Sequence, residues 1–109
     1  MVGGAGAKRS GTRSERNVKR IFETHGWRVV RSGGSLGPAD LACLKDGNVL
    51  LIQVKRRAGR KSFRSESAEI AGFPVYVVID FGRGIFRFDK SGSVLTNTSR
   101  HLRDFLETA

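Results

Sequence analysis

The sequence is short of cysteine and of long apolar runs. Cys43 is the one cysteine in 109 residues, so no disulfide can form within the chain and a disulfide-rich scaffold is excluded. A lone thiol in an apolar segment is typical of a reducing compartment, and we expect a cytoplasmic protein, either prokaryotic or encoded by a phage. No run of about 18 apolar residues occurs, so we expect no association with a membrane through a spanning helix.

Acidic residues are also scarce. The chain has 20 Lys and Arg against 10 Asp and Glu, a formal net charge of +10. Such an excess predicts a polyanionic partner, with nucleic acid as the first candidate and an anionic membrane surface as the second. The glycines at 33, 34 and 37 are not followed by the Lys-Ser/Thr helix start of a phosphate-binding loop, so no nucleotide cofactor is expected.

The pattern of apolar and turn residues predicts a single domain, residues 12–109, after a flexible basic arm, residues 1–11. Thr12 and Glu15 have the spacing of a capping box at the start of a helix. The expected helices are 13–25, 65–72 and 100–106, and the expected strands are 27–32, 39–45, 48–55, 74–80 and 85–89. This order predicts an α/β fold with a single mixed central sheet of about five strands flanked by helices.

The Asp-Gly turn at 46–47 brings polar side chains together. It makes the flanking strands antiparallel, so Asp40 pairs near Gln53 within about one residue. Strand side chains alternate between faces, so Gln53 and Lys55 point the same way, and the first helix can lay Glu15 over the same edge. Carboxylate and amide oxygens suit hard divalent ions, and we expect Asp40, Gln53 and Glu15 to bind Mg²⁺, for which Mn²⁺ can substitute.

Each of these residues also has a structural explanation. Glu15 can simply complete the capping box, and Asp40 after a proline can be a turn residue. Lys55 can begin the solvated basic run that follows it. Gln53 is harder to explain in this way, because a polar side chain in an apolar strand requires partners.

The spacing of Pro38, Ala39 and Asp40 ahead of Gln53 and Lys55 resembles the PD-(D/E)xK nuclease motif. With further matches at residues 15–35, 40–55 and 72–88, the chain resembles the archaeal-type Holliday junction resolvases (Hjc-like). The resemblance implies a restriction-endonuclease-like fold. It also implies a dimeric, Mg²⁺-dependent endonuclease that resolves four-way DNA junctions by paired symmetric nicks.

The resemblance also implies individual roles. Glu15 and Asp40 correspond to the metal-binding carboxylates, Lys55 to the motif lysine, and Ser35 to a loop serine near the catalytic site. Gln53 stands where the family usually has glutamate. It is either natural and active, as in the similar Mrr-like enzymes, or an inactivating change. An amide still binds a metal but brings no charge, so metal affinity should fall.

Two basic runs flank this cluster, and together they predict a groove that follows DNA phosphates. The cations expected there are Arg9, Arg13, Arg56, Arg57, Arg60 and Lys61, and the resemblance adds Arg16 and Arg31. Alternatives remain open at this point: a Mrr-like restriction or repair nuclease, a catalytically impaired basic DNA-binding module, and an RNA-binding protein. The absence of an aromatic stacking platform disfavours the last of these.

Two symmetric cuts in one junction require two copies of the site, so we expect a homodimer with twofold symmetry. The apolar segment 74–88 lies away from the basic runs. We expect it to expose one apolar face and to form much of the dimer contact, with help from the last helix.

Overall fold

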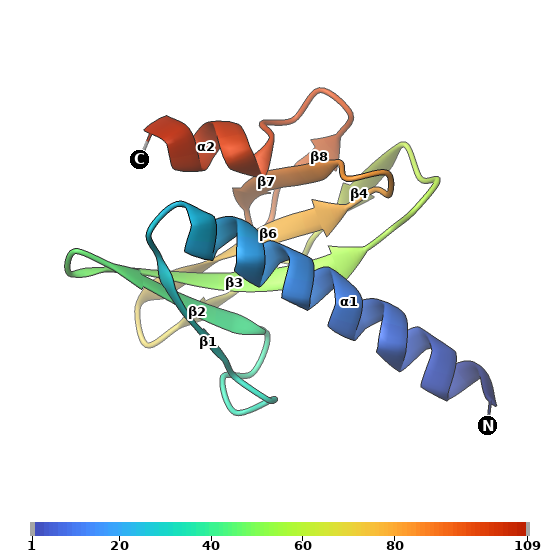
Figure 1. Cartoon of the computed structure of the whole chain (residues 1–109). Coiled ribbons are helices and arrows are strands. Elements are labelled where there is room, and N and C mark those ends of the chain that lie inside the picture. The colour runs from blue at the N-terminus through green and yellow to red at the C-terminus, as the bar shows by residue number, and fades with distance from the viewer. Residues whose placement is uncertain (1, 109) are drawn as a thin grey trace.

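A computed structural model describes residues 2–108, with side chains described for residues 12–108 (Figure 1). Its elements in chain order are α1 (Val2–Thr24), β1 (Arg28–Arg31), β2 (Leu41–Lys45), β3 (Asn48–Arg56), β4 (Ser62–Arg64), β5 (Glu69–Ile70), β6 (Phe73–Asp80), β7 (Phe86–Lys90), β8 (Val94–Thr96) and α2 (Leu102–Thr108). In the described part of the chain, no helix is both long and apolar enough to cross a membrane.

The central sheet has six strands and mixed pairing. Its order is β1-β2-β3-β6-β5, and β7 pairs with β6 as well. The central pair β3 and β6 is parallel, whereas the other pairs of this sheet are antiparallel. Strands β4 and β8 form a separate two-stranded sheet. This architecture confirms the predicted α/β fold with a mixed central sheet.

The β2–β3 hairpin forms as the Asp-Gly turn predicts. Asp46 and Gly47 have φ angles of 50° and 80°, the left-handed pair that a two-residue type I′ turn requires. The turn sets the register in which Leu41 faces Ile52 and Lys45 faces Asn48.

Helix α1 lies across one face of the sheet (Figure 1). Its apolar stripe, Val18, Ile21 and Phe22, is buried as predicted and packs with core-facing residues of β2 and β3. Helix α2 joins the same core. The opposite face of the sheet carries two smaller apolar clusters, centred on Leu51 with Val75 and on Val77 with Ile79.

The helix begins earlier than expected. Because α1 starts at Val2, Thr12 and Glu15 lie inside it and cannot form an N-terminal capping box, so that prediction is wrong. The side chains of residues 1–11, including Arg9, lie outside the described ones, and the flexible basic arm stays a prediction.

The helix expected at 65–72 is also absent. Residues 65–68 are irregular and lead into β5. Other parts of the chain take the backbone groups that a helix would use: Ser91 Oγ accepts the Ala68 N–H at 3.0 Å and donates to the Ala68 carbonyl at 3.1 Å, and the Ser93 carbonyl accepts the Ser65 N–H at 3.2 Å. These contacts come from residues distant in sequence, so local propensity could not indicate them.

Most apolar side chains of segment 74–88 are buried within the chain. Val75 and Val78 have no exposed surface, and Phe86 and Phe88 are each 5% exposed. Ile85, in the turn between β6 and β7, is 36% exposed. The two strands are nevertheless largely covered on both faces, so the expectation that they expose an apolar face is wrong, whereas their part in a dimer contact stays a prediction. Large apolar side chains that remain exposed include Val30, Leu44, Val49 and Phe73.

A buried carboxylate joins α1 to the sheet. Asp80, 3% exposed at the end of β6, accepts the Ser14 hydroxyl at 2.8 Å and the Gly82 N–H at 2.9 Å. The Arg56 guanidinium of β3 donates to the same carboxylate at 3.1 Å. Ser14 is itself buried and directly precedes Glu15. This contact therefore sets where α1 holds Glu15.

We expect Asp80→Ala to lower the free energy of unfolding by about 3 kcal/mol, because it leaves a buried hydroxyl and a guanidinium without their acceptor. Ser14→Ala should cost about 1 kcal/mol. Urea unfolding measures both. The control is Asp89→Ala on the exposed side of β7, where a change within about 0.5 kcal/mol is expected. An Asp80→Ala loss as small as that of the control would contradict the role of Asp80.

Candidate active site

Asp40 is held at the start of β2 by two hydrogen bonds to β3. Its N–H donates to the Ile52 carbonyl at 2.8 Å, and its Oδ2 accepts the Val54 N–H at 2.8 Å. Leu41 pairs with Ile52, so the next pair outward is Asp40 with Gln53. The backbone positions of Asp40 and Gln53 are thus adjacent across the hairpin, and Asp40 is oriented by the backbone of the residue between Gln53 and Lys55.

The loop before Asp40 is organised by Ser32. Its hydroxyl donates to the Ala39 carbonyl at 2.7 Å, and its N–H donates to the Asp40 carbonyl at 2.9 Å. Ser35 is exposed, and its hydroxyl donates to the Ser32 carbonyl at 2.6 Å. Ser32, which the sequence did not single out, therefore hydrogen-bonds directly to the backbone of Asp40, whereas the hydrogen bonds of Ser35 go to Ser32. Its place just before a glycine pair was the available signal.

Glu15 and Asp40 line one cavity of about 430 Å³. Glu15 projects from α1, and its Oε1 lies 3.3 Å from Arg31 Nη2 of β1. The rest of the lining includes Ser32 and the backbone at 33–34. Two carboxylates from distant parts of the sequence therefore face one cavity, and a guanidinium limits the repulsion between them.

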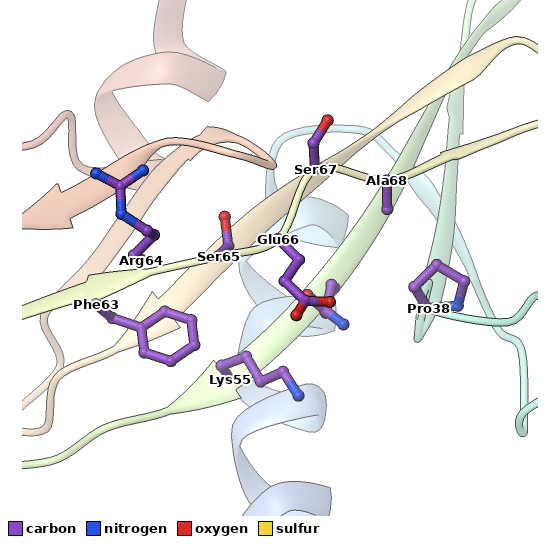
Figure 2. Close-up of a pocket in the computed structure, with 9 residues that line it drawn as sticks. Pro38, Lys55, Phe63, Arg64, Ser65, Glu66, Ser67 and Ala68 are labelled. Carbon is purple, nitrogen blue, oxygen red and sulfur yellow. The ribbon is translucent and has the colours of Figure 1, made fainter.

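Gln53 and Lys55 line a second cavity of about 470 Å³ on the face of β3 opposite α1 (Figure 2). Both side chains are half-buried, whereas their neighbours Ile52 and Val54 point into the core under α1. The predicted alternation is confirmed. Pro38 also lines this cavity, so the chain segment that leads into Asp40 passes from one cavity to the other.

The candidate metal-binding side chains carry the type of donor atom that hard divalent cations prefer. Glu15, Asp40 and Gln53 offer only oxygen atoms, which Mg²⁺ and Mn²⁺ prefer, and neither cavity is lined by a His or Cys for zinc. Within the described residues, no three His, Cys, Asp or Glu side chains form a ready metal cluster. Glu15 and Asp40 are the two carboxylates that share one cavity, and Gln53 lines the other.

The one thiol takes no part in this chemistry. Cys43 is fully buried on β2, and burial raises the pKa of its thiol to about 12. At neutral pH the group is therefore protonated, which makes it a poor nucleophile and a poor metal ligand.

The cations expected to bind DNA fall into two groups. Arg13, Arg16, Arg60 and Lys61 are exposed, the first two on α1 and the others in the segment between β3 and β4. The other three have partners within the chain: Arg31 pairs with Glu15, Arg56 pairs with Asp80, and Arg57 lies 4.5 Å from the Phe63 ring. The sequence did not indicate this structural use of the three arginines.

Comparison with known proteins gives consistent results. The family described as archaeal Holliday junction resolvase (Hjc) matches residues 6–94 of the chain. A crossover junction endodeoxyribonuclease Hjc from Methanocaldococcus jannaschii is 33% identical over 81 residues, which cover 67% of this chain and 60% of that protein. The chain thus spans somewhat less than two thirds of that relative.

The fold has a counterpart among solved structures. The crystal structure of Archaeoglobus fulgidus Hjc, a Holliday junction resolvase from an archaeal hyperthermophile, superposes with a TM-score of 0.66. The match covers 90% of this chain and 96% of that one, at 17% sequence identity. At this identity the likeness concerns the fold alone.

Proposed function

Because the chain belongs to the archaeal Holliday junction resolvase family, we propose that it is a structure-selective DNA endonuclease that resolves four-way junctions by paired symmetric nicks. The observation that carries this proposal is the pairing of Asp40 with Gln53, beside Lys55 on the same strand face. The activity is a hydrolysis of phosphodiester bonds in DNA. We place it in the cytoplasm of a prokaryotic cell, whether the gene belongs to the cell or to a phage.

The proposed roles follow from the donors and their positions. A divalent cation, Mg²⁺ or Mn²⁺, supplies polarisation of the scissile phosphate and acidification of a water when bound. Asp40, Gln53 and Glu15 would hold it, and the Val54 N–H fixes the orientation of Asp40. Lys55, on the same face as Gln53, is placed to orient the attacking water or to offset charge that develops on the phosphate.

The exposed cations support a DNA path past these cavities. Asp80 links Ser14 of α1 to Arg56 at the end of β3, so the cations of α1 and of the 57–61 segment emerge from neighbouring elements. Arg13 and Arg16 would then follow the phosphates on one side, and Arg60 and Lys61 on the other. Arg31, Arg56 and Arg57 also adjoin this path, although each already has a partner within the chain.

We propose that the active form is a homodimer, because one chain holds one Asp40–Gln53 pair and a resolved junction needs two cuts. Most of segment 74–88 is buried, and the large apolar side chains exposed among the described residues are Val30, Leu44, Val49, Phe73, Ile85 and Val94. Light scattering at micromolar concentration should give the mass of two chains, free or on junction DNA. A monomer under both conditions would contradict the paired-cut mechanism.

The cleavage test uses a four-way junction and a linear duplex with the same arms. We expect junction nicking with Mg²⁺ and none with EDTA. Asp40→Asn and Lys55→Ala should each lower the rate at least about 100-fold, while junction binding in EDTA stays close to that of the unmodified chain.

Matched controls are Asp89→Asn and Lys90→Ala, both exposed on β7, which should cut normally. Full activity of Asp40→Asn would rule out the metal mechanism. Equal cutting of linear duplex would favour a Mrr-like restriction or repair nuclease. Tight junction binding without any cutting would favour the impaired DNA-binding module.

Junction binding should weaken steeply with added salt, because phosphate contacts release counterions. Replacing Arg60 and Lys61 together with alanine should reduce the slope of log affinity against log salt by about 2, or roughly one for each lost contact. Arg103→Ala on α2 is the control and should leave the slope unchanged. A slope that is the same in all three proteins would remove the 60–61 pair from the DNA path.

A further inference from the structure

We propose that a cavity at the carboxyl ends of β3 and β6 binds a backbone phosphate of the DNA, and that Arg83 is a DNA-binding residue of this chain. The inference rests on the proposed nuclease function and deepens it, because it adds a contact for the same substrate. Arg83 lies outside both basic runs of the sequence, between two glycines in the turn that joins β6 to β7.

The cavity lies where the two parallel central strands end. β3 and β6 run in the same direction, and their last residues, Arg56 and Asp80, pair with each other (Figure 1). The segments that follow, 57–60 and 81–85, contribute most of the lining of a cavity of about 450 Å³. Loops beyond the carboxyl ends of parallel strands commonly bind ligands in α/β proteins. Because Arg56 directly follows Lys55, this cavity adjoins the strand end that carries the motif lysine.

The charged side chains that line this cavity are all cationic. They are Arg56, Arg60 and Arg83, and the Asn97 amide is the other polar side chain of the lining. The described lining contains no Asp or Glu. An anion is therefore the ligand that fits, and on a DNA substrate that anion is a backbone phosphate.

The Arg83 side chain is exposed and does not serve an ion pair within the fold. In the part of the chain whose side chains are described, the three ion pairs involve neither Arg83 nor Arg60. Arg56, by contrast, is already paired with Asp80. The charge that this cavity offers to a phosphate therefore comes chiefly from Arg60 and Arg83.

The backbone at position 83 disfavours an arginine. Residues 82–84 have φ angles of 94°, 58° and 75°, all in the left-handed region. Glycine adopts this region without strain, whereas a residue with a long side chain rarely does. A glycine would suit the turn better, so the turn itself does not account for Arg83. Strained positions of this kind occur preferentially at functional sites.

The turn is held against the neighbouring segment by backbone contacts. The Gly82 N–H donates to Asp80 Oδ1 at 2.9 Å, and the Arg57 N–H donates to the Asp80 carbonyl at 2.8 Å. A Cβ added at Gly82 would lie 3.5 Å from the Ala58 Cβ, so the two segments lie close together. The cavity is therefore already formed, and a phosphate can bind without ordering the backbone around it.

The test measures binding of the full-length chain to a fluorescent four-way junction in EDTA, by anisotropy at about 0.1 M salt. Arg83→Gly should weaken binding about tenfold, the effect of one lost phosphate contact at this salt concentration. Arg83→Lys keeps a charge and should retain most of the affinity. The matched control is Lys90→Ala, which removes an exposed cation at the other end of β7 and should bind normally.

Urea unfolding distinguishes phosphate binding from a structural role. Because glycine tolerates a positive φ, Arg83→Gly should unfold at a urea concentration no lower than that of the unmodified chain. Arg83→Asn also tolerates this backbone conformation and should bind as weakly as Arg83→Gly. A lower unfolding midpoint with unchanged junction affinity would show a structural role and overturn the proposal.

A double substitution tests whether Arg60 and Arg83 contact one phosphate. Arg60→Ala combined with Arg83→Gly should lose less affinity than the product of the two single losses, because the second change acts on a phosphate that is already held less tightly. A combined loss equal to that product would assign the two arginines to separate phosphates and overturn the shared site.

Equal junction affinity in Arg83→Gly and Lys90→Ala would overturn the proposal, as would a lack of DNA binding by the unmodified chain. Junction cleavage with Mg²⁺, measured separately, tests the proposed function. If Arg83→Gly loses affinity while the unmodified chain does not cut junctions, the phosphate site stands and the nuclease assignment fails. If the unmodified chain cuts junctions and Arg83→Gly binds normally, only the phosphate site fails.

Discussion

The buried Asp80 carboxylate is the interaction on which the arrangement of this molecule depends. It joins three elements that the sequence keeps far apart, since it accepts from Ser14 of α1 and from Arg56 of β3 while belonging to β6. Burying a carboxylate costs free energy of folding unless hydrogen-bond donors fill its acceptor positions. Asp80 is 3% exposed, so its donors are needed for stability. Arg56, which we proposed to adjoin the DNA path, therefore also has a structural role.

Strand β3 divides the candidate active site between two environments. Ile52 and Val54 face the core under α1, whereas Gln53 and Lys55 face an open cavity on the other side of the sheet. Asp40 directly precedes the neighbouring strand β2. Its carboxylate accepts a hydrogen bond from the backbone of β3, at the Val54 N–H. The hydrophobic packing that holds α1 thus also helps to position Glu15 relative to β3.

Much of the fold and part of the site could be predicted from local sequence. The turn at 46–47 determines the register through its backbone angles, so the pairing of Asp40 with Gln53 followed from two residues. The 65–72 segment could not be predicted in this way, because Ser91 takes its backbone hydrogen bonds across a distance of more than twenty residues. The burial of most apolar side chains in segment 74–88 escaped for the same reason, since it depends on tertiary neighbours.

The hairpin has a consequence for how this protein can vary. Asp40 and Gln53 meet because the number of residues between them is matched to a two-residue turn. Sheet side chains alternate, so one inserted or deleted residue would rotate Gln53 and Lys55 into the core and bring Ile52 and Val54 to the cavity. Changes of length between these positions are therefore incompatible with the pairing of Asp40 and Gln53.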